Sequence, residues 1–196
     1  MDETLVVTAE PPEFVKFPSI KRLSRDMVVT EKIDGTNASI RITEDSQFLT
    51  GSRTRWITPG DDNQGFSQWA HENEEALREL GVGTHGGEWW GQGIQRKYGL
   101  DEKRFSLFNT GLWNAENTPD CVSVVPVLYT GPFSVKIVDR LLLTLHEGGS
   151  FAAPGFMNPE GVVIFHTHSY TLFKKTLDHN DEHKFLNVAD PRKAAS

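Results

Sequence analysis

The chain has 196 residues, of which 37% are hydrophobic, 10% aromatic and 24% charged, and this composition excludes a disordered or fibrous chain. Its 20 Lys and Arg against 27 Asp and Glu give a formal net charge of −7, which argues against a broad basic surface for a long nucleic acid. The single cysteine, Cys121, cannot form an intramolecular disulfide, and no apolar run approaches the roughly 20 residues of a membrane span. We therefore expect one domain over residues 1–196, in the cytoplasm and without membrane contact.

The first half of the chain predicts three strands followed by one helix. Runs of β-forming residues at 27–32, 38–42 and 47–52 are separated by Asp34-Gly35 and by Glu44-Asp45-Ser46, which are typical of turns, so we expect a three-stranded meander. From 66 to 80 apolar residues recur at helical spacing, and Gly81 supplies a stop signal. This pattern predicts one amphipathic helix over 66–80.

The second half predicts more strands and a second helix. The strands are expected at 87–90, 105–109, 122–128, 162–166 and 170–174. A second amphipathic helix is expected over 134–147, because apolar residues share one face before Gly148-Gly149. The mixture predicts an α+β domain dominated by antiparallel strands.

A lysine stands directly after the first predicted strand, in Lys32-Ile33-Asp34-Gly35. A lysine amine attacks as a nucleophile only when it is deprotonated, which burial or neighbouring positive charge promotes. Taken alone this short motif is weak, because a hairpin with an exposed lysine has the same pattern.

Further short motifs follow in order along the chain: Ser52-Arg53, Gly87-Glu88-Trp89-Trp90-Gly91, Phe108, Glu160-Gly161-Val162-Val163-Ile164 and Lys174-Lys175. In this order they resemble the motifs of the covalent nucleotidyltransferases, the polynucleotide ligases and mRNA capping enzymes. The string from Glu31 to Asn37 is most similar to the ATP-dependent RNA ligases of the bacteriophage type 2 and editing ligase group. The resemblance spans residues 32–175 and implies an ATP-grasp-like ligase adenylation domain, with antiparallel sheets flanked by helices.

The resemblance also implies a reaction. Lys32 would attack the α-phosphate of ATP, release pyrophosphate and carry AMP as a phosphoramidate. The AMP would then pass to an RNA 5′-phosphate, and an RNA 3′-hydroxyl would displace it to seal the strand.

Glu160 would hold Mg²⁺ or Mn²⁺, because carboxylate oxygens suit these ions. Lys174 and Lys175 would neutralise the α-phosphate; they are adjacent, whereas the ligases space these lysines one residue apart. Successive strand residues face opposite sides, so only one of the two can point into the site, and Lys174 is the first choice.

The remaining motif residues would bind the nucleotide. By resemblance, Glu31 would lie at the adenine edge, Phe108 would stack on adenine, and Glu88 would accept a hydrogen bond from a ribose hydroxyl. Arg53 would reach the ribose or phosphate, and Asn37 would contact the phosphates. Asp34 would orient the lysine or a metal-bound water, and Gly35 would let the backbone turn beneath the nucleotide. Three of these residues have a plainer interpretation. Phe108 could be an ordinary core residue, Arg53 a solvated residue at a strand end, and Glu88 a carboxylate on an edge strand.

Several alternatives stay open at the level of sequence. The basic cluster of Arg96, Lys97, Lys103 and Arg104 could guide an RNA backbone or form a solvated loop. One of Trp89 and Trp90 is expected in the core and the other in the pocket. Few residues follow the last motif, so a partner could supply the function of a C-terminal domain. A DNA ligase core, a GTP-dependent capping domain and an inactive nucleotide- or RNA-binding module are the rival functions.

Overall fold

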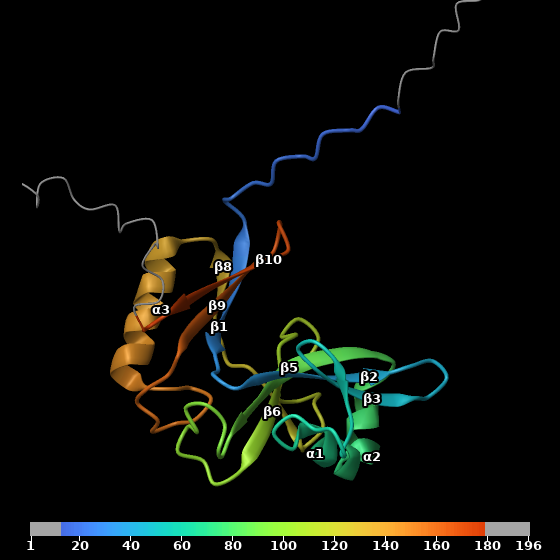
Figure 1. Cartoon of the computed structure of the whole chain (residues 1–196). Helices are drawn as coiled ribbons and strands as arrows, with labels where there is room; N and C mark the ends of the chain where they lie inside the picture. Colours follow the sequence, from blue (N-terminus) through green and yellow to red (C-terminus); the bar gives the residue numbers. More distant parts are fainter. Residues whose placement is uncertain (1–12, 179–196) are drawn as a thin grey trace, which may run out of the picture.

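The computed structural model describes residues 13–178 and has an α+β architecture of two mainly antiparallel sheets with few helices (Figure 1). The four-stranded sheet has the order β10-β9-β1-β8, and its strands are β1 (Asp26–Lys32), β8 (Val127–Pro132), β9 (Gly161–His166) and β10 (Thr171–Thr176). The six-stranded sheet has the order β4-β3-β2-β5-β6-β7, with β2 (Thr36–Ile42), β3 (Phe48–Ser52), β4 (Trp56–Ile57), β5 (Gly83–Gly91), β6 (Lys103–Leu107) and β7 (Val122–Val124). Only β6 and β7 pair in parallel among these strands, so the predicted α+β class is confirmed.

The helices lie on one side of each sheet (Figure 1). The long helix α3 (Val135–Gly148) covers the four-stranded sheet, and its buried residues Val138 and Leu142 pack with Met27 and Val29 of β1. The short helices α1 (Phe66–Glu72) and α2 (Glu74–Leu77), with a 3₁₀ turn at Arg78–Leu80, cover the six-stranded sheet. Each sheet thus has one face in a helix-covered core, and a third buried cluster with Trp90 and Tyr98 covers part of the other face of β5. Within residues 13–178, no helix is long and apolar enough to cross a membrane.

The predicted helix over 66–80 is interrupted at Asn73, which the apolar spacing did not indicate. The Asn73 side-chain amide donates to the Trp69 carbonyl over 2.8 Å, and the Asn73 backbone N–H donates to the same oxygen over 3.1 Å. An asparagine side chain that competes for helical carbonyls weakens the helix interior. The predicted helix over 134–147 is confirmed within one residue at each end.

The predicted three-stranded meander is wrong, because β1 and β2 belong to different sheets. Between them Ile33 is buried, Asp34 donates its N–H to the Tyr98 hydroxyl over 2.8 Å, and Gly35 donates its N–H to Glu88 over 3.0 Å. A Cβ on Gly35 would lie 2.4 Å from the Trp89 carbonyl oxygen, so only glycine allows this close approach to β5. The motif after Lys32 is a crossing between sheets and not a hairpin turn.

The predicted strand over 122–128 is likewise divided between the two sheets. Val125 and Pro126 separate β7 from β8, and the Pro126 carbonyl accepts the Glu31 N–H over 2.9 Å. Val125 and Ile33 belong to one buried cluster, so the two crossings pack together where the sheets meet. Trp89 and Trp90 are each 1% exposed, so both are core residues, on opposite faces of β5, and the expectation that one lines a pocket is wrong.

Candidate active site

Lys32 ends β1 on the face opposite α3. Met27 and Val29 point toward that helix, so the alternation of side chains places Thr30 and Lys32 on the other face of the sheet. There the Lys32 Nζ donates to the Glu160 carboxylate over 2.7 Å. The side chains are 24% and 15% exposed, which makes this a partly buried ion pair that solvent can still reach. Two predicted site residues 128 positions apart are thus brought into contact.

Glu88 lies on β5 at the sheet crossing and is 7% exposed. One carboxylate oxygen accepts the Gly35 N–H over 3.0 Å, and the other accepts the Asn37 side-chain amide over 3.0 Å. Three predicted nucleotide-binding residues therefore form one hydrogen-bonded cluster beside the lysine. Burial raises the pKa of Glu88 to about 7, against the lowering effects of the Gly35 bond, the Lys32 charge and the Asn37 bond.

The raised pKa of Glu88 predicts a pH dependence of stability. Because the folded-state pKa is about 7 and the ordinary value is 4.5, folding takes up a proton between these values, and the Glu88 contribution to stability falls as pH rises from 4.5 through 7. We expect the free energy of unfolding of the wild type, relative to Glu88→Gln, to fall by up to about 3 kcal/mol across this window. Urea unfolding of both proteins at pH 5 and pH 8 measures this difference; a difference that does not change with pH would contradict the expectation.

The two C-terminal lysines of β10 face opposite sides of the four-stranded sheet. Lys174 pairs across the sheet with Val163, which pairs with Thr30, so Lys174 lies on the same face as Lys32 and is exposed. Lys175 points the other way, toward α3, where its Nζ contacts the Asp139 carboxylate over 2.5 Å. The strand register therefore favours Lys174 over Lys175 for a role at the site.

Arg96 joins the chain segments around the site, a role that the sequence did not indicate. Its guanidinium contacts Asp34 over 3.1 Å, the Asn158 side chain over 3.1 Å and the Asp178 carboxylate. Although burial disfavours the charged form, the carboxylates of Asp178 and Asp34 raise the pKa of Arg96 above its ordinary value. The Arg96 side chain is 14% exposed, and it links Asp34 to the loop that contains Asn158.

The other members of the predicted basic cluster also have protein partners. The Lys103 Nζ donates to the Gln64 carbonyl over 2.7 Å, and Arg104 pairs with Glu102 over 2.6 Å. The interpretation of this cluster as a guide for RNA therefore finds no support at Arg96, Lys103 or Arg104.

Glu31 lies on the α3 side of β1 and is 1% exposed. Its carboxylate accepts the Ser150 hydroxyl over 2.6 Å and the backbone N–H groups of Phe151 and Ala152 over 2.8 and 2.9 Å. Burial raises the pKa of Glu31, and these three bonds oppose that effect. The carboxylate anchors the loop after α3, and its predicted place at the adenine edge stays a prediction.

Phe108 and Arg53 are both exposed on the six-stranded sheet. Phe108 is 44% exposed, which removes the core interpretation and leaves its ring available for stacking. It follows β6 directly, and its N–H donates to the Gly86 carbonyl over 3.0 Å, two residues before Glu88. Arg53 follows β3 with an exposed side chain. Their roles toward a nucleotide stay predictions.

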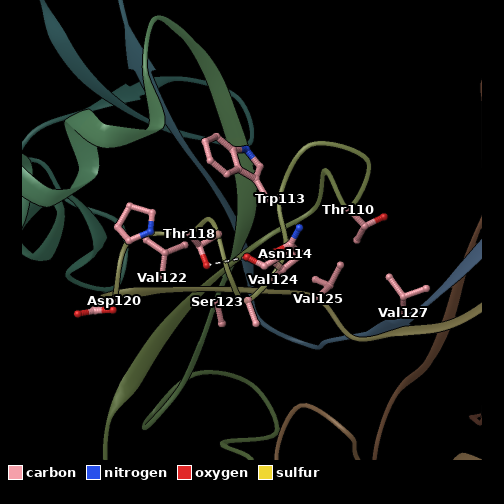
Figure 2. A pocket seen from close by; sticks show the side chains of 12 residues that line it. Thr110, Trp113, Asn114, Thr118, Asp120, Val122, Ser123, Val124, Val125 and Val127 are labelled. Carbon is pink, nitrogen blue, oxygen red and sulfur yellow. Dashed lines mark hydrogen bonds between the residues drawn. The ribbon is translucent and has the colours of Figure 1, made fainter.

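A hollow of about 490 Å³ lies apart from these residues, between the chain from 110 to 120 and β7 (Figure 2). Trp113, Asn114 and Val127 are among its lining residues, and the Thr118 hydroxyl donates to the Asn114 carbonyl over 3.0 Å at its wall. None of the predicted site residues lines it. The candidate active site is therefore identified from the Lys32–Glu160 pair and the Glu88 cluster, and not from this hollow.

The carboxylates beside Lys32 can be tested against the chemistry of a divalent ion. Within the described part of the chain, no group of three or more His, Cys, Asp and Glu side chains is arranged to hold a metal by itself. Mg²⁺ commonly uses one or two protein carboxylates and completes its shell with water and substrate phosphates. Glu160, partly exposed and beside the amine, fits a metal site of that kind.

Residues 25–179 match the family model described as RNA ligase, and the chain belongs to this family. No curated protein sequence matches it significantly.

Solved structures with the same fold include variants of the Naegleria gruberi RNA ligase. One, determined with AMP and Mn, has a TM-score of 0.57 and 20% identity, with 79% of this chain and 50% of that chain covered. Another, determined with ATP and Mn, has a TM-score of 0.56 and 20% identity over 79% and 50% of the chains. An apo variant has a TM-score of 0.56 and 19% identity over 78% and 50%. This chain thus spans about half the length of the Naegleria ligase and shares its fold over that half.

Proposed function

We propose that this protein is an ATP-dependent RNA ligase that works through AMP carried on Lys32. The observation that carries the proposal is the contact of 2.7 Å between the Lys32 Nζ and Glu160, at the end of a strand beside the buried Glu88. A lysine at a strand end, close to one carboxylate that can accept its proton and to a second carboxylate that can accept a sugar hydroxyl, fits a nucleotidyl transfer. Membership in the RNA ligase family and the AMP- and ATP-bound Naegleria structures support the same choice of substrate.

In the first step the Lys32 nitrogen attacks the α-phosphorus of ATP. Lys32 first gives up one proton, for which the Glu160 carboxylate is in hydrogen-bond contact, so that its nitrogen has a free lone pair; the N–P bond then forms while the bond to pyrophosphate breaks, and the nitrogen releases a second proton to solvent. Lys174, on the same face, adds positive charge where the α-phosphate becomes more negative. A bound Mg²⁺ or Mn²⁺ would supply further charge neutralisation at the phosphates.

The two later steps would transfer the AMP to an RNA 5′-phosphate and then release it as an RNA 3′-hydroxyl attacks. In the second step the Lys32 N–P bond breaks and a phosphate-to-phosphate bond forms, which restores the amine. In the third, the 3′-oxygen forms the new phosphodiester and AMP leaves. Glu88 and Asn37 would keep the nucleotide oriented through these steps, and the 3.0 Å hydrogen bond between them supports a joint role.

A label-and-chase experiment tests the proposal. The full chain is incubated with Mg²⁺ or Mn²⁺ and either α-labelled ATP or α-labelled GTP, and is then given 5′-phosphorylated RNA or DNA with 3′-hydroxyl ends. We expect label from ATP, but not from GTP, to stay with the denatured protein and to move to RNA. Preference for GTP would favour a capping enzyme and transfer to DNA alone a DNA ligase, whereas no labelling would leave only a binding module.

A further inference from the structure

One row of residues crosses the six-stranded sheet on the face that carries Glu88. Trp56 pairs with Gly51, Gly51 with Ser39, and Ser39 with Gly86, whose carbonyl accepts the Phe108 N–H. The row therefore begins and ends with an exposed aromatic side chain, Trp56 at 57% and Phe108 at 44%.

The direction of Trp56 follows from its neighbours. Thr50 and Ile57 are buried on the helix side, where the Thr50 hydroxyl contacts the Ser67 hydroxyl of α1 over 2.7 Å. Alternation along β3 and β4 then turns Gly51 and Trp56 to the opposite face. Ser39 shares that face with Asn37, two residues earlier on β2, and the Asn37 amide bonds to Glu88. The Trp56 ring thus belongs to the same face of the sheet as the candidate active site.

The strand positions between the two aromatic residues are two glycines and one serine, so they carry almost no side-chain atoms. A Cβ on Gly51 would lie 3.2 Å from the Trp56 ring, and one on Gly86 would lie 3.9 Å from the Phe108 ring. Two glycines and a serine therefore leave both rings uncovered by neighbouring side chains. An aromatic ring exposed above a bare sheet is a common platform for nucleobases, because every base has a face that can stack.

Trp56 also lines a hollow of about 300 Å³ with polar walls: Ser39, Gly51, Ser52, Thr54 and Arg55. The Arg55 guanidinium is fixed by two bonds to the Asp61 carboxylate, of 2.5 and 2.9 Å. An indole face beside the hydroxyl groups of Ser39, Ser52 and Thr54 provides stacking and hydrogen bonds to a sugar, while Arg55 is already paired with Asp61 and shapes the wall of the hollow. This combination suits a nucleotide better than an apolar ligand.

The hollow is too far from Phe108 to share one base with it. Four strand-to-strand steps separate Trp56 on β4 from Phe108 after β6, which is roughly 19 Å between their Cα positions. If Phe108 stacks on the adenine of ATP, Trp56 is available to a different base. The strand that must lie beside the nucleotide in a ligase is the RNA whose end is joined.

We propose that Trp56 and the surrounding hollow form a second nucleobase subsite, which stacks on a base of the RNA strand near the end to be sealed. The proposal rests on the proposed ligase function for the identity of the strand, but the stacking itself depends only on Trp56. Among the five tryptophans, Trp69 and Trp113 are partly buried, Trp89 and Trp90 are buried, and Trp56 is the exposed one.

The test uses the full chain, a short 5′-phosphorylated RNA with a fluorescent label, and the variants Trp56→Ala, Trp56→Phe and Leu143→Ala. Leu143 is 52% exposed on α3, so its truncation is the matched control. We expect Trp56→Ala to weaken RNA binding about tenfold or more, as the loss of one stacked base does. Trp56→Phe should retain most of the affinity, and Leu143→Ala should bind as the wild type does. RNA should quench tryptophan fluorescence in the wild type but not in Trp56→Phe.

The outcomes separate this inference from the ligase function. Labelling with α-labelled ATP is measured on the same samples, and the loss of RNA affinity in Trp56→Ala should exceed any loss of labelling. Wild-type RNA affinity in Trp56→Ala, or quenching that persists in Trp56→Phe, would overturn the inference even if the protein labels and ligates. Absence of labelling in the wild type, with an RNA affinity that still depends on Trp56, would instead count against the ligase function alone. Equal melting temperatures of all four proteins exclude a folding defect.

Discussion

Replacing Lys32 with alanine is expected to abolish the transfer of AMP from ATP to the protein. Without the amine at the end of β1, the proposed phosphoramidate cannot form. Lys32→Arg should be equally inactive, since a guanidinium keeps its charge and its proton at any accessible pH. The measurement is retention of label from α-labelled ATP after denaturing electrophoresis.

The matched control for this variant is Lys136→Ala, which removes an exposed lysine from α3. It should label at the wild-type rate. Lys32→Ala also breaks the ion pair with Glu160, so its melting temperature is measured in parallel, and the folded variant is expected to retain ATP binding through Phe108 and Glu88. Full labelling in folded Lys32→Ala would identify a different nucleophile.

Replacing Lys174 with alanine should slow adenylylation about 10²- to 10³-fold, the effect of losing one well-placed donor of transition-state charge. Replacing Lys175 should change the rate by less than about tenfold, because its amine is engaged with Asp139 on the other side of the sheet. Rates from single-turnover labelling at saturating ATP measure the chemical step without the contribution of binding.

The conservative variants refine this comparison of the two lysines. Lys174→Arg keeps the positive charge and should recover part of the rate lost in Lys174→Ala, whereas Lys175→Arg should resemble the wild type. Equal and severe losses in Lys174→Ala and Lys175→Ala would contradict the assignment by strand register, since β10 would then have to present both side chains to the phosphate.

Most of the strands and the helix α3 were predictable because their signals are local, although the two-residue strand β4 was not expected. Alternating burial in β1, β2 and β9 and the apolar face of α3 can be seen within short windows of the sequence. The division of strands between two sheets is not local. Asp34-Gly35 has the composition of a hairpin turn, and what makes it a crossing is the approach of Gly35 to the Trp89 carbonyl, 54 residues away in the chain.

The same reason limits what the sequence could say about the site. That Lys174 and Lys175 face opposite sides could be predicted, because the alternation of side chains is a property of a single strand. Arg96 could not be identified, since its partners Asp34, Asn158 and Asp178 come from three distant segments, and its own neighbours indicate only a basic loop. Glu31 is next to Lys32, but the loop at 150–152 that binds its carboxylate is known only from the fold.

Mass spectrometry of the protein after incubation with ATP and Mg²⁺ tests the central claim most directly. The account predicts one AMP adduct, stable to denaturation and lost in acid, on the proteolytic peptide that contains Lys32, with pyrophosphate released in equal amount. An adduct on any other residue, or none while the protein binds ATP and remains folded, would contradict it.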